Sequence, residues 1–337
     1  MSSNNILEPL VDSLIGATGL FFKAAYMGFD MLGNIMYRII EGKPFEASTE
    51  ELEEGVIVDN IVKYKFIPVE SFVSVNKSNK LIRYEYIEGE KEGIKACIGC
   101  DMEGNYKWLD MLDGHLLVGG ATDWGKSSVI NVFLTSIMQN YTSNEIILGG
   151  CDPKASDIYY FRQFEHFKSV GVTTDIEGFI KQMGALKREM DRRAEILELA
   201  NCRNVKKYNE VSEDKLPYIV FIIDELPQIM ANDKCKRELH LIMAKARSYG
   251  AYFILITQDG TKESIGKCKM NCNQVIGFHT KDSTDSNTLI NDDRLYKIKD
   301  KGRCYFTNGK EDFVETQIFF IEEEEMKNIL SKYKKVE

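Results

Sequence analysis

Short hydrophobic runs alternate with amphipathic segments over residues 98–320. The runs of strand length are His115–Gly119, Glu145–Gly149, Tyr218–Ile223 and Ala251–Ile256. Strands that are apolar on both faces are typical of a parallel sheet covered by helices on both sides. Helical spacing follows the first run and recurs at residues 175–199 and 236–249. The pattern therefore predicts an α/β domain with a mostly parallel central sheet flanked by helices.

Residues 1–45 are predicted to form an apolar helical segment. Residues 13–40 are almost continuously apolar, and their few charged and amide side chains fall on one narrow stripe of a helix. A membrane span is disfavoured because Lys23 and Asp30 would each cost about 2.5–3.5 kcal/mol near the bilayer centre. Two alternatives stay open: a helix packed against the protein or a partner subunit, or a helix lying on a membrane surface.

Residues 46–97 are predicted to form a linker and a small β-rich subdomain. Residues 46–54 are mainly acidic, and β-branched and aromatic residues then alternate with charges. An acidic and basic tail is expected at 321–337. The whole chain carries 43 Lys and Arg against 52 Asp and Glu, which excludes a simple cationic coat for nucleic acid. Eight cysteines without framework spacing and the lack of a cleavable signal peptide favour free thiols in the cytoplasm.

The strongest chemical signal is GATDWGKS at residues 120–127, a match to the pattern G-x-x-x-x-G-K-[ST]. It lies between a predicted strand and a predicted helix, so backbone N–H groups and the helix N-terminus converge on one phosphate site. Lys126 is expected to contact the β and γ phosphates of ATP, and Ser127 to bind Mg²⁺. The predicted nucleotide-binding residues are Gly120, Ala121, Thr122, Asp123, Trp124, Gly125, Lys126, Ser127 and Ser128.

A second element with catalytic side chains is expected where the strand 218–223 ends. Asp224 and Glu225 follow this apolar run directly, at the sheet edge where ligands of open α/β sheets bind. Asp224 is the candidate for the Mg²⁺ shell, and Glu225 for polarising the attacking water. Thr257 and Gln258 end the strand 251–256 and are expected to face the γ-phosphate.

An arginine from a neighbouring subunit can stabilise the transferring phosphoryl group in ring ATPases. Arg247 is the candidate for that role in this chain.

Five ordered blocks together resemble the motor domain of FtsK/SpoIIIE DNA translocases. The blocks are HLLVGGATDWGKSS, CDPKASD, KREMDRRAEILELANCRNVKKYNE, LPYIVFIIDELPQIM and AKARSYGAYFILITQ. The resemblance covers residues 98–320 and implies a RecA-like P-loop NTPase fold. It also implies a hexameric ring that couples ATP hydrolysis to movement of double-stranded DNA.

Compact members of this family occur on conjugative elements, plasmids and phages, where they resemble coupling proteins. The resemblance therefore implies transfer of mobile-element DNA, with a relaxase or a membrane transfer channel as partner. Such a protein is expected in the cytoplasm, at the inner face of the cell membrane.

If DNA passes through a ring, basic loops at the sheet edge should contact its phosphates, independently of base sequence. Two loops are more basic than the rest of the chain, at 261–273 and 293–303. The predicted DNA-binding residues are Lys262, Lys267, Lys269, Arg294, Lys297, Lys299 and Lys301.

Three departures from the family pattern keep a second function open. Asp123 places a carboxylate in the phosphate loop, Trp124 is bulky where small residues are usual, and Asn287 replaces a customary arginine. The alternative is a slow or inactive nucleotide-switched factor that recruits a relaxase or a membrane channel.

Overall fold

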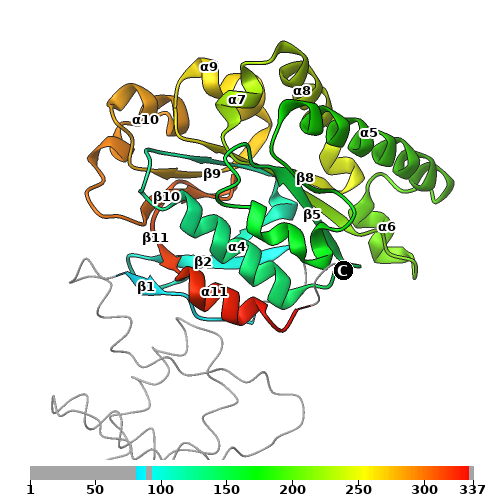
Figure 1. Ribbon diagram of the computed structural model, residues 1–337, viewed down its shortest axis with the longest axis horizontal. Helices are drawn as coiled ribbons and strands as arrows, with labels where there is room; N and C mark the ends of the chain where they lie inside the picture. The colour runs from blue at the N-terminus through cyan, green and yellow to red at the C-terminus, as the bar shows by residue number, and fades with distance from the viewer. Residues whose placement is uncertain (1–80, 89–92, 334–337) are drawn as a thin grey trace, which may run out of the picture. The chain divides into compact units, whose positions relative to one another are not determined.

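One mixed sheet with helices on both faces forms the part of the protein that the structure describes (Figure 1). The structure is a computed structural model and describes residues 81–88 and 93–333, so the predicted segment 1–45 and the linker lie outside it. The strand order is β3-β2-β11-β10-β9-β4-β8-β7-β5-β6, and β1 pairs with β11. The strands are β1 (Ile82–Arg83), β2 (Lys95–Asp101), β3 (Tyr106–Asp110), β4 (His115–Gly119), β5 (Ile146–Cys151), β6 (Gly171–Thr173), β7 (Tyr218–Ile223), β8 (Ala251–Thr257), β9 (Cys272–Phe278), β10 (Arg303–Thr307) and β11 (Val314–Phe320).

Several helices begin at short polar side chains that accept hydrogen bonds from first-turn amides. Asp175, Asn204, Asn232 and Asp282 fill this role at four helices. The α-helices are α4 (Lys126–Asn140), α5 (Ile176–Leu199), α6 (Val205–Val211), α7 (Leu226–Met230), α8 (Asp233–Ala246), α9 (Lys262–Ile265), α10 (Ser283–Ile290) and α11 (Glu323–Leu330). The 3₁₀ helices are η3 (Met111–Asp113), η4 (Tyr159–Gln163), η5 (Glu165–Phe167), η6 (Arg247–Tyr249), η7 (Gly266–Asn271) and η8 (Arg294–Lys297).

The parallel part of the sheet runs β9-β4-β8-β7-β5-β6, as the apolar runs predicted. Alternate side chains of β7 enter two different cores. Val220 and Ile222 pack with α4 on one face, while Phe221 and Ile223 pack with α5 and α8 on the other. Figure 1 shows α4 and α11 on one side of the sheet and α5 and α8 on the other. This two-sided burial is why the strand has no polar positions.

The described part of the predicted β-rich subdomain belongs to this same sheet. The strand β2 crosses the predicted boundary between residues 97 and 98, and it pairs antiparallel with β3 and β11. The boundary therefore falls inside a strand, because the alternating pattern continues into the ATPase sheet. Residues 321–333 do not form the expected tail. They include α11, which packs on α4 and buries Met326 and Leu330.

Two further findings concern the whole described region. All eight cysteines are unpaired thiols there. Within residues 81–88 and 93–333, no helix is both long and apolar enough to cross a bilayer.

Candidate functional site

The loop of residues 120–127 joins β4 to α4, as predicted. Three of its residues have positive φ: Gly120 at 147°, Asp123 at 65° and Gly125 at 122°. A Cβ at Gly120 would lie 2.7 Å from Cβ of Phe278, and one at Gly125 would lie 2.8 Å from the Phe278 ring. Both positions therefore require glycine for backbone conformation and for space. Aspartate is among the few other residue types that tolerate positive φ, which explains why the exposed position 123 can be an aspartate.

The loop offers a continuous series of free backbone donors. Among the described residues, the amide N–H groups of residues 122–128 have no hydrogen-bond acceptor, whereas that of Val129 already donates to the Gly125 carbonyl. Such N–H groups at a helix N-terminus, in a loop with alternating backbone conformations, form an anion site. The loop can therefore bind the phosphates of a nucleotide.

Lys126 lies inside the loop and is buried. Its ammonium donates to the carbonyls of Gly120 and Ala121, each at 2.7 Å. Burial lowers the pKa of Lys126 to about 8, against the opposing influence of Glu225, Asp224 and Asp157. These three carboxylates act on the lysine because they lie at the same sheet edge. The predicted convergence of the P-loop and the acidic pair is therefore present in the structure.

Strand register explains this convergence. Gly119 pairs with Thr257, and Ile223 pairs with both Leu255 and Cys151, so β4, β8, β7 and β5 end at one edge. The strand β8 lies between the P-loop strand and the acidic strand.

A cluster of carboxylates lies at this edge, and one of them binds Ser127. The Ser127 hydroxyl donates to Oδ2 of Asp157 at 2.7 Å. Asp152, which is fully buried, fixes the intervening turn because its Oδ2 accepts from the amides of residues 157, 158 and 159. Burial raises the pKa of Asp224 to about 7, and the negative charges of Asp157 and Asp152 add to the effect. A cation bound beside Asp224 would oppose both effects, because a nearby positive charge favours the ionised carboxylate.

Glu225 is held in an unusual conformation. Its φ is 68°, a left-handed value that is uncommon for a non-glycine residue and is often found at functional sites. Its Oε2 lies 2.5 Å from the Lys154 ammonium, and this hydrogen bond raises the pKa of Lys154. The predicted water-activating carboxylate is therefore engaged by a lysine at the end of β5.

Of the two polar residues that end β8, only Gln258 faces the P-loop. Its Oε1 accepts from the Thr122 hydroxyl at 3.0 Å. Thr257 is fully buried, and its hydroxyl donates to the Asp259 carbonyl at 2.6 Å. The expectation that Thr257 faces the γ-phosphate is therefore wrong, because its hydroxyl closes the turn after the strand.

Sequence reasoning missed the roles of Asp152, Lys154 and Asp157. All three belong to the block CDPKASD, which carried the family resemblance but received no chemical assignment. Their position after a strand that ends beside β7 was the available signal, since polar residues at that edge face the ligand.

The donor set fits a magnesium nucleotide. Mg²⁺ prefers oxygen ligands and usually takes one or two protein oxygens together with phosphate oxygens and water. Ser127, Asp224 and Asp157 provide such oxygens, and the buried Oδ1 of Asp152 lacks a hydrogen-bond partner in the described structure. Within residues 81–88 and 93–333, no group of three or more His, Cys, Asp or Glu residues is placed to hold a metal by itself. The phosphates would therefore have to complete the coordination.

Arg247 lies at the opposite edge of the sheet. It precedes β8, whose seven residues span roughly 23 Å at about 3.3 Å per residue, and its guanidinium donates to Oδ1 of Asn273 at 3.1 Å. Arg247 therefore does not contribute to the nucleotide site of its own subunit, and its predicted role in a neighbouring site stays a prediction.

The seven predicted DNA-binding cations divide into two groups. Lys269 donates to the Thr288 carbonyl at the end of α10, while Arg294 and Lys297 pair with Asp292 and Asp293. The others are exposed and have no charged or hydrogen-bonding partner for their ammonium groups within the described residues: Lys262, Lys267, Lys299 and Lys301. The last two lie beside the nucleotide site, because Gly302 N–H donates to the Trp124 carbonyl at 3.0 Å.

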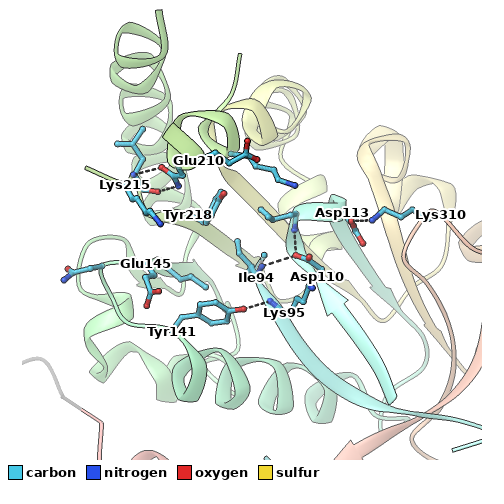
Figure 2. Close-up of a pocket in the computed structure, with 17 residues that line it drawn as sticks. Ile94, Lys95, Asp110, Asp113, Tyr141, Glu145, Glu210, Lys215, Tyr218 and Lys310 are labelled. Carbon is cyan, nitrogen blue, oxygen red and sulfur yellow. Dashed lines mark hydrogen bonds and ion pairs between the residues drawn. The ribbon is translucent and has the colours of Figure 1, made fainter. Parts of the chain in front are cut away.

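A separate hollow of about 410 Å³ lies at the opposite edge, at the starts of β2, β5 and β7 (Figure 2). Several of its polar groups already bind partners within the protein. Oδ1 of Asp110 accepts from the amides of Ile94 and Leu112, the Tyr141 hydroxyl accepts from Lys95 N–H, and Lys310 pairs with Asp113. None of the predicted site residues lines it.

The fold and the site define a P-loop ATPase domain. The FtsK/SpoIIIE family model matches residues 82–261, more than half of the chain. The chain therefore belongs to the FtsK/SpoIIIE family.

Known proteins of similar sequence bear the name DNA translocase. The chain is 29% identical over 262 residues to DNA translocase SftA of Bacillus subtilis strain 168, covering 75% of this chain and 27% of that protein. It is 29% identical over 287 residues to DNA translocase FtsK of Staphylococcus aureus strain Mu50, covering 79% of this chain and 36% of that protein. The chain thus spans only about a quarter to a third of the length of these relatives.

Solved structures support the fold. The pCW3 conjugation coupling protein TcpA, in its monomer form with ATPγS, matches with a TM-score of 0.64 and 22% identity, over 76% of this chain and 75% of that one. EssC ATPases 2 and 3 from Geobacillus thermodenitrificans match with a TM-score of 0.65 and 21% identity, over 76% of this chain and 52% of that one.

Proposed function

We propose that the protein is an ATP-dependent double-stranded DNA translocase that moves DNA of a mobile element as a homo-hexameric ring. One observation carries the proposal: free P-loop amides, a cluster of carboxylates and an exposed basic loop meet at one sheet edge. The names of the sequence relatives support DNA as cargo, and the conjugation role of the similarly folded TcpA supports a mobile element.

In this proposal the P-loop residues bind the triphosphate. The amides of residues 122–128 donate to phosphate oxygens, and Lys126 moves its ammonium from the loop carbonyls to the β and γ phosphates. Ser127 and Asp224 would hold Mg²⁺, which would neutralise the charge that develops on these phosphate oxygens. Glu225 accepts the proton of the attacking water after Lys154 releases its carboxylate. Gln258 keeps β8 in contact with the loop through Thr122.

The four exposed lysines are proposed to contact DNA phosphates. A protein with a net charge of −9 repels DNA on average, so contact depends on local groups. Lys262, Lys267, Lys299 and Lys301 have no acidic partner in the described residues that would compete with phosphate. Repetition around a ring would then multiply a few contacts in each subunit.

The deciding experiment measures ATP hydrolysis by the full chain, with and without linear duplex DNA, over a range of salt concentrations. We expect DNA to raise the rate, and the stimulated part to fall steeply with salt because phosphate contacts release counterions. An assembled ring that hydrolyses ATP equally well without DNA would contradict translocation.

A second function is favoured by the Lys154–Glu225 ion pair. An engaged carboxylate is a poor base, as required of a nucleotide-switched docking factor that hydrolyses ATP slowly or not at all. Tight ATP binding without turnover, together with ATP-dependent binding of a relaxase or a transfer-channel protein, would support this function instead.

The proposed location is the cytoplasm, at the inner face of the membrane. The proposal rests on the apolar residues 13–40 and on the partner that a coupling role would require. Co-sedimentation of the full chain with anionic lipid vesicles tests the contact, and equal sedimentation after removal of residues 13–40 would argue against it.

A further inference from the structure

Three aromatic rings connect the P-loop to the basic loop. The Trp124 ring stacks on the His279 ring, with centroids 4.0 Å apart and planes inclined by 28°. The His279 ring in turn faces the Tyr296 ring, with centroids 6.4 Å apart and planes inclined by 24°. We call this set (Trp124, His279 and Tyr296) the aromatic link. It runs from the phosphate site to η8, the 3₁₀ helix that precedes Lys299 and Lys301.

The backbone reinforces the same connection. Ala121 N–H donates to the His279 carbonyl at 2.7 Å, and Gly302 N–H donates to the Trp124 carbonyl at 3.0 Å. A Cβ at Gly125 would lie only 3.2 Å from Cα of Gly302, so the two loops are in close contact. The basic segment 297–301 is therefore joined to Trp124 on both sides, at Tyr296 through the rings and at Gly302 through the backbone.

The link contacts are held by stacking more than by side-chain hydrogen bonds. Nδ1 of His279 is buried and has no hydrogen-bond partner in the described structure. The centroid distance of 4.0 Å leaves no space for a nucleotide base between Trp124 and His279. The Trp124 and His279 rings therefore pack on each other, and of the three rings only that of Tyr296, a residue that is 50% exposed, offers much surface to solvent.

We propose that the aromatic link couples the two sites, so that phosphate binding at the P-loop repositions Lys299 and Lys301, and DNA at these lysines alters the P-loop. This inference rests on the proposed DNA translocation. Trp124, a departure from the family pattern, is here the residue that joins the loops. Tyr296 and His279 are positioning residues that act through Trp124, because neither belongs to the P-loop or to the carboxylate cluster.

The test uses Tyr296→Ala in the full chain, which leaves the P-loop and both lysines intact. Tyr86→Ala is the matched control, since Tyr86 is 47% exposed and lies outside the link. Tyr296→Phe keeps a stacking ring. The measured quantity is the ratio of kcat with saturating linear duplex DNA to kcat without it.

We expect Tyr296→Ala to lower this ratio by about fivefold or more, the lower end of ordinary coupling between sites, with kcat in the absence of DNA unchanged. Tyr296→Phe and Tyr86→Ala should keep the ratio of the unmodified protein. An unchanged ratio in Tyr296→Ala would overturn the link alone. A loss confined to DNA affinity would also overturn it, since Tyr296 would then simply contact DNA. No stimulation of the unmodified protein would remove both the proposed function and the link.

Fluorescence gives an independent readout, because the chain has two tryptophans and Trp108→Phe leaves Trp124 alone. We expect duplex DNA without nucleotide to change the emission of Trp124, and Tyr296→Ala to abolish the change. Emission that is unaffected by bound DNA would contradict the inference.

Discussion

The two ends of the parallel strands have similar side chains but differ in where their hydrogen bonds go. At the edge where β2, β5 and β7 begin, Asp110, Asp113 and Lys310 lie around a hollow of about 410 Å³ and bind partners within the protein. At the edge where β4, β7 and β5 end, the amides of residues 122–128 and Oδ1 of Asp152 have none in the described structure.

The difference shows why the hollow is a poor guide to the site here. Buried polar groups are normally paired, so the unpaired Oδ1 of Asp152, beside the other carboxylates of this edge, supports a missing ligand there. Charge supports the same distinction, since burial among carboxylates raises the pKa of Asp224 to about 7 at the nucleotide edge. Seven consecutive free amides at a helix N-terminus, and not the volume of the hollow, identify the phosphate site.

The largest expected effect comes from removing charge at the nucleotide edge. Lys126→Ala removes the ammonium that is held at the loop, and Glu225→Gln removes the proposed base. Each should lower kcat for ATP hydrolysis by about 10²-fold or more. Lys310→Ala is the control at the opposite edge, where the Lys310 side chain is exposed and its loss should not affect the rate. Comparable losses in all three variants would remove the distinction between the edges.

His115 should produce an effect on stability and not on catalysis. It is fully buried at the start of β4; its Nδ1 accepts from Phe253 N–H, and its Nε2 pairs with the Met243 carbonyl. Burial lowers its pKa to about 4, below the 6.5 of an unfolded chain. The unfolded state therefore binds more protons between these values, and stability falls as pH falls through this window.

The expected loss is about 3 kcal/mol between pH 7 and pH 4, from about 1.4 kcal/mol per pKa unit. The measurement is the difference in free energy of unfolding between the unmodified protein and His115→Gln at several pH values. That difference should shrink by this amount as the pH falls. A constant difference would show that His115 does not titrate in this range.

The strands and site residues that could be predicted from the sequence are those that a short local sequence pattern determines. The apolar runs predicted β4 and β7 at the bounds observed, and the glycine pattern placed the P-loop between a strand and a helix. Asp224 and Glu225 followed from their position after an apolar run. Each signal lies within about ten residues, where helix and strand periodicity act.

The missed residues depend on contacts between distant segments. Asp157 and Ser127 are 30 positions apart in sequence. They meet only because the register of β5 with β7 brings the turn after β5 to the edge where the P-loop strand ends. The Trp124–His279 stack spans an even larger separation. The boundary at 97 and 98 failed for the same reason, since the pairing of β2 with β11 joins the two ends of the domain. Local propensity carries no information about such pairings.

Asp157→Asn tests whether the missed carboxylate belongs to the metal site. Asparagine keeps the acceptor for the Ser127 hydroxyl but removes the charge, so the Mg²⁺ concentration for half-maximal ATP hydrolysis should rise by about 10–100-fold. The readout is a Mg²⁺ titration at fixed ATP. Asp113→Asn is the matched control, because Asp113 binds a lysine at the opposite edge. An unchanged Mg²⁺ requirement in Asp157→Asn would mean that this carboxylate only fixes the serine rotamer.

The smallest expected effect distinguishes charge that is free from charge that is already paired. Lys299 and Lys301 are exposed, and their ammonium groups have no partner among the described residues. The Lys297 ammonium, in contrast, lies 2.8 Å from Oδ1 of Asp293. If both free lysines contact phosphate, Lys299→Ala/Lys301→Ala should reduce the slope of log Kobs against log salt by about 2 per subunit. Lys297→Ala should reduce it less, because its ion pair must first open. DNA binding by the full chain at several salt concentrations measures both slopes. Equal slopes for the two variants would mean that pairing within the loop does not decide which lysines face DNA.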